Sequence, residues 1–160
     1  MIKNRRAFIV GLKSLTLSKK EIVFLKKYKP WGIILFSRNI SSIEQTKKLT
    51  DRIKKIFKDK KYPILIDQEG GRVNRLGKII SFDNLTSEYF GNLFTKDKKK
   101  FNIIYKLFID KTSYLLKSIG VNINTVPVLE NNTQNVIEYV TQTNNKKKKK
   151  FNFWKLLDND

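Results

Sequence analysis

The sequence predicts an α/β fold in which parallel strands are covered by helices. Along the chain the order is strand, helix, strand, helix, strand, loop, helix, strand, and this alternation is typical of a parallel sheet. The strands are continuous apolar runs, as expected when both of their faces are buried. Polar clusters follow two of them, at residues 37–39 and 67–72, and in such folds the chemistry lies at the carboxyl ends of the strands.

Three short apolar runs in the first half of the chain have the length of buried strands. They are residues 7–12 (AFIVGL), 32–36 (GIILF) and 63–67 (PILID). A helical pattern separates each run from the next, so we expect the three runs to be neighbouring strands of one sheet.

Two serines mark the expected starts of the first two helices. Ser18 precedes Glu21, and Ser41 precedes Glu44, with the spacing of a capping box, in which the two side chains bond to each other's backbone N–H groups. Pro30 ends the first helix, because proline cannot continue it. The expected buried residues are Ile22, Leu25 and Tyr28 in the first helix and Ile43, Leu49, Ile53 and Ile56 in the second.

After a polar loop, residues 101–119 predict a long amphipathic helix. Gly120 has the position of a C-terminal cap, where glycine adopts the left-handed conformation without strain. Residues 121–126 (VNINTV) predict a fourth strand, which is half polar and ends at Pro127. The apolar stripe of the long helix consists of Ile104, Leu107, Phe108, Leu115 and Ile119.

The chain of 160 residues contains no histidine and no cysteine. These absences exclude disulfides, thiolate zinc sites, cysteine nucleophiles and any histidine general base or triad. We expect no metal and no cofactor. No apolar run approaches the ~18 residues of a membrane span, and no targeting segment is recognisable, so we expect a cytoplasmic protein without a membrane partner.

A net charge of +20 makes nucleic-acid binding one hypothesis. Almost all of the excess is lysine, accompanied by many isoleucines and asparagines, as an AT-rich coding sequence favours. Arginine, which makes bidentate contacts to phosphate and guanine, is scarce. We therefore interpret the charge as compositional bias and do not expect a nucleic-acid partner. The lysine run at residues 146–150 is then a solvated tail.

The densest group of chemically active side chains is the segment 67–75 (DQEGGRVNR). Asp67 and Glu69 are two residues apart, so in a strand they would point to the same side. Two carboxylates roughly 5–7 Å apart would be near the ~5–5.5 Å of a retaining glycosidase pair. Beside Arg72 and Arg75 they would equally form a structural network of ion pairs. From the residues alone, binding of a polar ligand and structural ion pairing both remain open.

This segment and others resemble the amino-terminal part of glycoside hydrolase family 3, and among its members the bacterial β-N-acetylhexosaminidases. The resemblance covers about residues 7–130 and implies a partial (β/α)8 barrel made of the first three to four β/α units. It also implies a retaining enzyme that removes terminal N-acetylglucosamine from muropeptides in peptidoglycan recycling. The segments that carry it are 30–40 (PWGIILFSRNI) with Gln45 and Leu49 after it, 64–76 (ILIDQEGGRVNRL) and 120–129 (GVNINTVPVL).

The resemblance implies roles for four residues of the motif. Asp67 and Arg75 correspond to positions that bind the sugar substrate, and Glu69 and Arg72 would shape the pocket. The family's third substrate arginine, its KHFPGHG-like loop, its histidine acid/base and its nucleophilic aspartate have no counterparts in this chain. We therefore assign no catalytic residue and expect the chain alone to be inactive.

Residues 131–160 differ in composition, being rich in Asn, Thr and Gln and then in lysine. We expect one barrel-related domain at 7–130 and a divergent, poorly ordered tail at 131–160. A truncated or frame-shifted copy would explain the pattern, because a long adenine tract encodes a lysine run. The rival hypotheses are a non-catalytic sugar-binding remnant and a basic nucleic-acid-binding protein; no oligomeric state is indicated.

Overall fold

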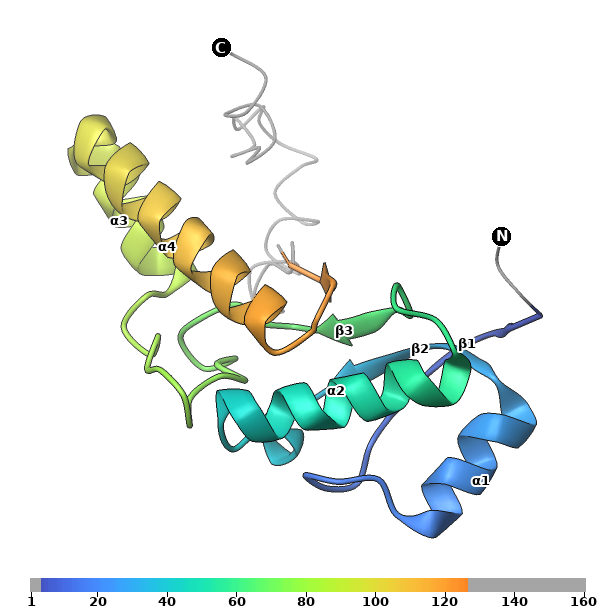
Figure 1. Ribbon diagram of the computed structural model, residues 1–160. Helices are drawn as coiled ribbons and strands as arrows, with labels where there is room; N and C mark the ends of the chain where they lie inside the picture. The colour runs from blue at the N-terminus through green and yellow to red at the C-terminus, as the bar shows by residue number, and fades with distance from the viewer. Residues whose placement is uncertain (1–3, 127–160) are drawn as a thin grey trace, which may run out of the picture. The chain divides into compact units, whose positions relative to one another are not determined.

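A four-stranded parallel sheet forms the centre of the fold in the computed structural model, which describes residues 4–126 (Figure 1). The strands lie side by side in chain order, and each pairs in parallel with the next. The predicted α/β fold with parallel strands is therefore confirmed. The strands are β1 (Arg6–Gly11), β2 (Pro30–Leu35), β3 (Ile64–Ile66) and β4 (Ile123–Asn124).

Helices occupy each connection between consecutive strands. Helix α1 joins β1 to β2, α2 joins β2 to β3, and α3 and α4 together join β3 to β4. In Figure 1, α2 lies in front of the sheet, with α1 on one side of it and α4 on the other. The helices are α1 (Lys19–Tyr28), α2 (Ile43–Phe57), α3 (Ser87–Lys96) and α4 (Lys98–Ser118), with one 3-10 turn, η1 (Ser37–Asn39).

The hydrophobic core lies between the sheet and the helices. Every second residue of β2 and β3 points into it, as the pleat requires. Complete burial of one such aliphatic side chain stabilises the fold by about 1.5–3 kcal/mol. The core includes Ile33, Leu35, Ile64 and Ile66 from the strands and Leu25, Leu49, Ile53 and Leu115 from the helices.

The other face of the sheet is also apolar. Ile34 pairs with Leu65, and Leu65 pairs with Ile123, so the three side chains share one face across three strands. Ile9 of the neighbouring β1 is 45% exposed. Both faces of the sheet are therefore apolar, which explains why the strands appear in the sequence as continuous apolar runs.

The first helix begins and ends as predicted. The hydroxyl of Ser18 accepts a hydrogen bond from the N–H of Glu21, and the Glu21 carboxylate accepts one from the N–H of Ser18. Leu25 is buried, and Lys29 ends the helix in the left-handed conformation with φ 46°. Pro30 then opens β2.

The start of α2 differs from the prediction by one residue. Ser42, not Ser41, is the cap, and its hydroxyl accepts a hydrogen bond from the N–H of Gln45. Ser41 instead donates its N–H to the side-chain oxygen of Gln45, 2.9 Å away. Glu44 pairs along the helix surface rather than closing a capping box, and Ile43, which we expected to be buried, is 41% exposed. The expected Ser41–Glu44 box is wrong because the amide of Gln45 takes the glutamate's place.

Helix α3 lies within the segment that the sequence analysis assigned to a polar loop. Thr86 caps it by accepting a hydrogen bond from the N–H of Tyr89, 3.0 Å away. Its buried residue, Phe90, has aromatic neighbours on α4: Phe101, Tyr105 and Phe108. These contacts stabilise a helix that is too short to be stable alone.

Packing against α3 also determines which face of α4 is buried. Phe101, Leu115 and Leu116 are buried on this helix, whereas Leu107, which we placed in the apolar stripe, is 66% exposed. The stripe prediction is wrong at Leu107 because α4 packs against α3 through its first half, at Phe101 and Phe108, and meets α2 at its end, where Thr50 bonds to Ile119. Gly120 ends the segment with φ 81°, as its predicted capping role requires.

Two sequence predictions concern residues that the structure does not cover. The tail at 131–160 and the last part of the domain at 7–130 lie outside residues 4–126. Within that range, none of the helices has the length and hydropathy needed to cross a bilayer.

Candidate functional site

Polar side chains from two strands meet at the carboxyl ends of the sheet. Because Leu35 of β2 pairs with Ile66 of β3, the two strands end at the same level. Arg38 follows the first in η1, and Asp67 follows the second directly. The two polar clusters that follow these strands in the sequence, at residues 37–39 and 67–72, therefore lie at the same rim of the sheet.

Asp67 and Arg75 form a bidentate ion pair at this rim. The guanidinium donates from Nε to Oδ1 at 3.1 Å and from Nη2 to Oδ2 at 2.6 Å. These hydrogen bonds raise the pKa of Arg75 despite partial burial, and the negative charges of Asp67 and Glu69 act in the same direction. Both side chains keep about a quarter of their surface exposed, at 23% for Asp67 and 26% for Arg75. The pair is therefore held in place but remains accessible.

Glu69 and Arg72 have different positions. Strand β3 ends at Ile66, so strand alternation does not apply to Asp67 and Glu69, and the expected same-side carboxylate pair loses its geometric basis. Glu69 is half-buried and lies in a tight turn in which its N–H bonds to the carbonyl of Val73. Arg72 is exposed and takes part in none of the salt bridges found within residues 4–126.

The two glycines of the motif allow this turn to form. Gly70 and Gly71 have φ of 95° and 57°, values that side chains with a Cβ rarely adopt. A Cβ on Gly70 would lie 2.4 Å from the carbonyl oxygen of Leu85. The N–H of Gly71 also bonds to the carbonyl of Phe82 at 2.9 Å. The motif therefore lies flat against the segment before α3, and this brings Arg75 back to Asp67.

The sequence is similar to part of known beta-hexosaminidases. Over 69 residues the chain is 45% identical to the beta-hexosaminidase of Alkalilimnicola ehrlichii, a match that covers 42% of this chain and 19% of that protein. The beta-hexosaminidase of Histophilus somni is 44% identical over the same length, with the same coverage. The matched segment thus spans about one fifth of these relatives. No family model matches the chain.

The fold is similar to a larger share of a solved structure. Native NagZ from Neisseria gonorrhoeae superposes with a TM-score of 0.68 at 27% identity, covering 81% of this chain and 38% of that one. The same protein in complex with N-trifluoroacetyl-D-glucosamine gives a TM-score of 0.67. The chain is therefore similar in sequence to part of the beta-hexosaminidases and in fold to part of NagZ. It spans well under half the length of these proteins.

Two residues that were not among the predicted site residues hold the motif in place. Gln68 is only 1% exposed, and its side chain donates to Asn74 and accepts from the N–H of Leu76. The side chain of Asn124 on β4 accepts from the N–H of Gln68 at 3.0 Å and donates to its carbonyl at 3.2 Å. A signal was present in the sequence, since the fourth strand carries asparagine at alternate positions. Asn122 makes the corresponding contacts to Ile64 and to the turn before it.

The second polar cluster of the rim has a structural role toward β1. Arg38 donates from Nε to the carbonyl of Leu12 at 2.7 Å, and the buried Asn39 donates to the same carbonyl at 3.1 Å and to that of Ser14 at 2.9 Å. Together they fix the connection that leaves β1. The rim is therefore continuous from the end of β1 to the end of β4.

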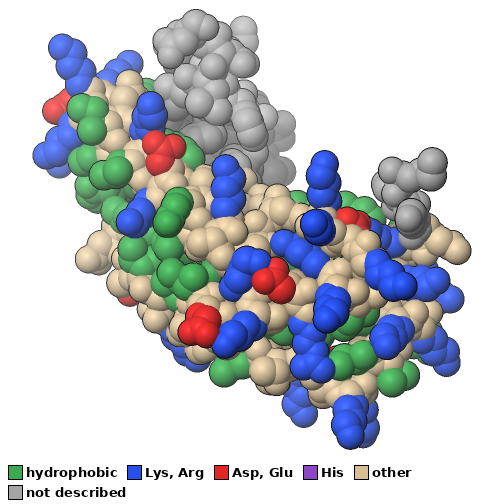
Figure 2. Space-filling view, in the orientation of Figure 1, with side chains coloured by type: hydrophobic (Ala, Val, Ile, Leu, Met, Phe, Trp, Pro, Cys, Tyr) green, Lys and Arg blue, Asp and Glu red, His purple; other side chains and the backbone are tan. Residues whose placement is uncertain are grey.

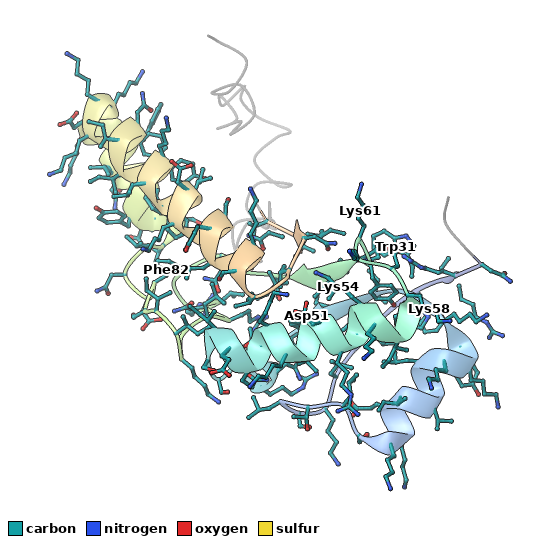
Figure 3. The ribbon with its side chains drawn as sticks, viewed as in Figure 1. Trp31, Asp51, Lys54, Lys58, Lys61 and Phe82 are labelled. Carbon is teal, nitrogen blue, oxygen red and sulfur yellow. The ribbon has the colours of Figure 1, made fainter. Side chains whose placement is uncertain are left out.

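Lysines, not apolar side chains, surround the groove found elsewhere on the described surface. It measures about 650 Å³. Of its lining residues, Figure 3 labels Asp51 and Lys54 on α2 and Lys58 directly after it. Neither Asp67 nor Arg75 lines it, so we place the candidate site at the rim, where the bidentate pair lies. Within residues 4–126 no three acidic side chains are close enough to hold a metal ion. The lining residues are Lys47, Asp51, Lys54, Lys55, Lys58, Asp59 and Lys60.

Proposed function

We propose that this chain is the amino-terminal, sugar-binding part of a family 3 β-N-acetylhexosaminidase, and that Asp67 and Arg75 hold the sugar. The observation that carries the proposal is the accessible bidentate pair on a glycine-containing turn at the carboxyl ends of parallel strands. The similarity of the chain to beta-hexosaminidases and to NagZ supports N-acetylglucosaminides as the class of ligand.

The pair has hydrogen-bonding capacity left for a ligand. A carboxylate offers about four acceptor sites and a guanidinium five donors, and the ion pair occupies two of each. The remaining acceptors suit sugar hydroxyls, and the remaining donors suit hydroxyl or carbonyl oxygens. Because both groups are charged, each such hydrogen bond is roughly twice as strong as a neutral one.

The finer proposals follow from the family resemblance. The parallel units at 7–130 form part of a (β/α)8 barrel, and the apolar face that carries Ile34, Leu65 and Ile123 is the interior side of that barrel. The ligands are peptidoglycan-derived muropeptides, which the protein binds in the cytoplasm during cell-wall recycling. Within the pocket, Glu69 and Arg72 have a shaping role, and the segment 131–160 is a separate tail.

We propose that the chain alone does not hydrolyse the glycosidic bond. Retaining hydrolysis requires a nucleophile on one face of the sugar and a proton donor at the leaving oxygen. Positioned proton transfer contributes ~10²–10⁴-fold, and the chain has no histidine to supply it in the family's manner. Both carboxylate oxygens of Asp67 already accept hydrogen bonds from Arg75.

Titration with N-acetylglucosamine, followed by NMR on the isotope-labelled chain, tests the binding proposal. Loss of a charged hydrogen-bonding group should weaken binding about 10-fold or more in Asp67→Ala. The matched control is Asp110→Asn, an exposed carboxylate on α4, which should bind as the natural chain does. Equal binding by Asp67→Ala and the natural chain would refute the role of the pair.

A chromogenic β-N-acetylglucosaminide tests the catalytic part of the proposal. We expect no turnover by the purified chain. Turnover that disappears in Asp67→Ala or Glu69→Ala would overturn this expectation and restore a carboxylate-pair mechanism.

A further inference from the structure

Two arginines of the rim, Arg38 and Arg75, lie over the same aromatic ring. Phe36 follows β2 directly and is half-buried. The guanidinium carbon of Arg75 is 5.5 Å from the centre of its ring, and that of Arg38 is 4.4 Å from it. Both distances are within the ~6 Å over which a cation is attracted to an aromatic face.

The ring itself is held by its surroundings. The N–H of Phe36 donates to the side-chain oxygen of Asn39 at 3.0 Å, which fixes the backbone at the end of β2. Gly11 of β1 leaves the space the ring needs, since a Cβ there would lie 3.0 Å from the ring and 3.1 Å from Nη2 of Arg38. Arg38 is fixed in turn by its bond to the carbonyl of Leu12. The position of the Phe36 ring is therefore fixed by contacts that do not involve Arg75.

Arg75 needs such a support. It lies on the long turn after β3, its side chain has many rotamers, and ordering it costs conformational entropy. Asp67 fixes the guanidinium through its edge, at Nε and Nη2. Phe36 contacts it separately, so two different kinds of contact restrict the same group.

We propose that Phe36 is a positioning residue of the site, which orients Arg75 so that its free N–H groups face the sugar. This inference rests on the proposed sugar-binding function for its ligand, but the contact between ring and guanidinium can be measured without ligand. Gly11 and Arg38 belong to the same arrangement, because they fix the ring.

The experiment compares Phe36→Leu with Phe36→Tyr. Leucine fills much of the space but has no aromatic face, whereas tyrosine keeps the face. In the free protein, the NMR signal of the Arg75 Nε–H, assigned through its disappearance in Arg75→Lys, should shift in Phe36→Leu and exchange with water about threefold faster or more, since one restraint on the guanidinium is lost. Phe36→Tyr should restore both. Phe24→Leu on α1, the same substitution away from the rim, should leave the signal unchanged.

The sugar titration gives the second measurement. Phe36→Leu should weaken N-acetylglucosamine binding about threefold to tenfold, the range of a partly exposed cation–aromatic contact. In an Arg75→Ala background the same substitution should have no further effect, because Phe36 acts through Arg75.

The outcomes separate the two proposals. An unchanged Arg75 signal in Phe36→Leu overturns the positioning role, whatever the sugar does. A changed signal in a chain that does not bind N-acetylglucosamine leaves Phe36 as the support of Arg75 and refutes the proposed function. Weaker sugar binding that persists equally in the Arg75→Ala background would show that Phe36 acts on the ligand directly, and this too overturns the inference.

Discussion

At the residue scale, one carboxylate connects proton binding to folding. Glu21 accepts hydrogen bonds from the N–H of Lys13 at 3.0 Å, from the N–H of Ser18 at 2.8 Å and from the Ser18 hydroxyl at 2.7 Å. Partial burial raises the pKa of Glu21, but these hydrogen bonds and the charge of Lys13 together lower it below the ordinary value of 4.5. The ionised carboxylate of Glu21 therefore caps the start of α1 and, through the N–H of Lys13, also anchors the connection that follows β1.

A pH dependence of stability follows from this shift. The unfolded chain binds more protons than the folded chain between the two pKa values, so the Glu21 contribution is complete above 4.5 and is lost as the pH falls through the lowered pKa. We expect Glu21→Gln to reduce the free energy of unfolding by about 0.5–1 kcal/mol at pH 7, as loss of a partly exposed cap does. The difference from the natural chain should shrink as the pH falls from 4.5 through the lowered pKa of Glu21.

Urea unfolding followed by circular dichroism at several pH values measures this effect. Asp110→Asn removes the same charge from an exposed position on α4 and serves as the control. A Glu21→Gln deficit that is independent of pH would contradict the assignment.

At the element scale, two side chains of α2 bond to the end of α4 and form a junction between the helices. The hydroxyl of Thr50 donates to the carbonyl of Ile119 at 2.8 Å, and Nζ of Lys54 donates to the carbonyl of Gly120 at 2.6 Å. Both carbonyls are at the end of α4, where no helical partner remains for them. Burial, and then the charge of Lys47, lower the pKa of Lys54. The junction therefore provides hydrogen-bond donors for the carbonyls at the end of α4 and fixes the chain shortly before β4.

Gly120→Ala should disrupt this junction. The residue has φ 81°, and a Cβ would lie 2.4 Å from the hydroxyl oxygen of Thr50. Left-handed strain and overpacking together should lower the free energy of unfolding by about 2–4 kcal/mol. Gly91→Ala is the matched control, because a Cβ in α3 meets nothing within 4 Å there. That variant should be up to about 1 kcal/mol more stable. Similar effects of the two substitutions in urea unfolding would contradict the junction.

At the scale of the whole molecule, positive charge is spread over several elements. Figure 2 shows lysine and arginine side chains scattered over the visible surface, with few acidic ones among them. The groove along α2 contains two carboxylates, of which Asp51 pairs with Lys47 and Asp59 with Arg5. This distribution is typical of a general lysine excess and supports our interpretation of the charge as compositional.

We therefore expect only weak, sequence-independent binding to duplex DNA. Binding through lysine–phosphate contacts falls steeply with salt, so it should be visible near about 20 mM salt and lost by about 200 mM. Lys58→Glu in the groove should change the affinity no more than Lys99→Glu on α4. A fluorescence-anisotropy salt series measures both, and sequence-selective binding that survives 200 mM salt would support the nucleic-acid hypothesis instead.

The sequence predicted local features well where they depend on neighbouring residues. The Ser18–Glu21 box, the end of α1 before Pro30 and the left-handed Gly120 are set within a few residues, and all were found. The errors arose where a distant side chain intervened. The side chain of Gln45 bonds to Ser41, so α2 is capped one residue later than predicted. Phe90, on the α3 helix that was not predicted, determines which face of α4 is buried.

The same distinction applies to the candidate site. The order of parallel strands and helices, the position of Asp67 at the end of a strand and the absence of histidine could all be predicted from the sequence, because they follow from composition and from short-range pattern. Contacts in the folded chain show that Arg75 binds Asp67, that Glu69 and Arg72 lie outside this ion pair, that Gln68 and Asn124 hold the motif, and that Phe36 contacts Arg75. The physical reason is that β3 ends at Ile66 and two left-handed glycines fold the chain back on itself. The direction of every later side chain then depends on contacts with segments distant in the sequence.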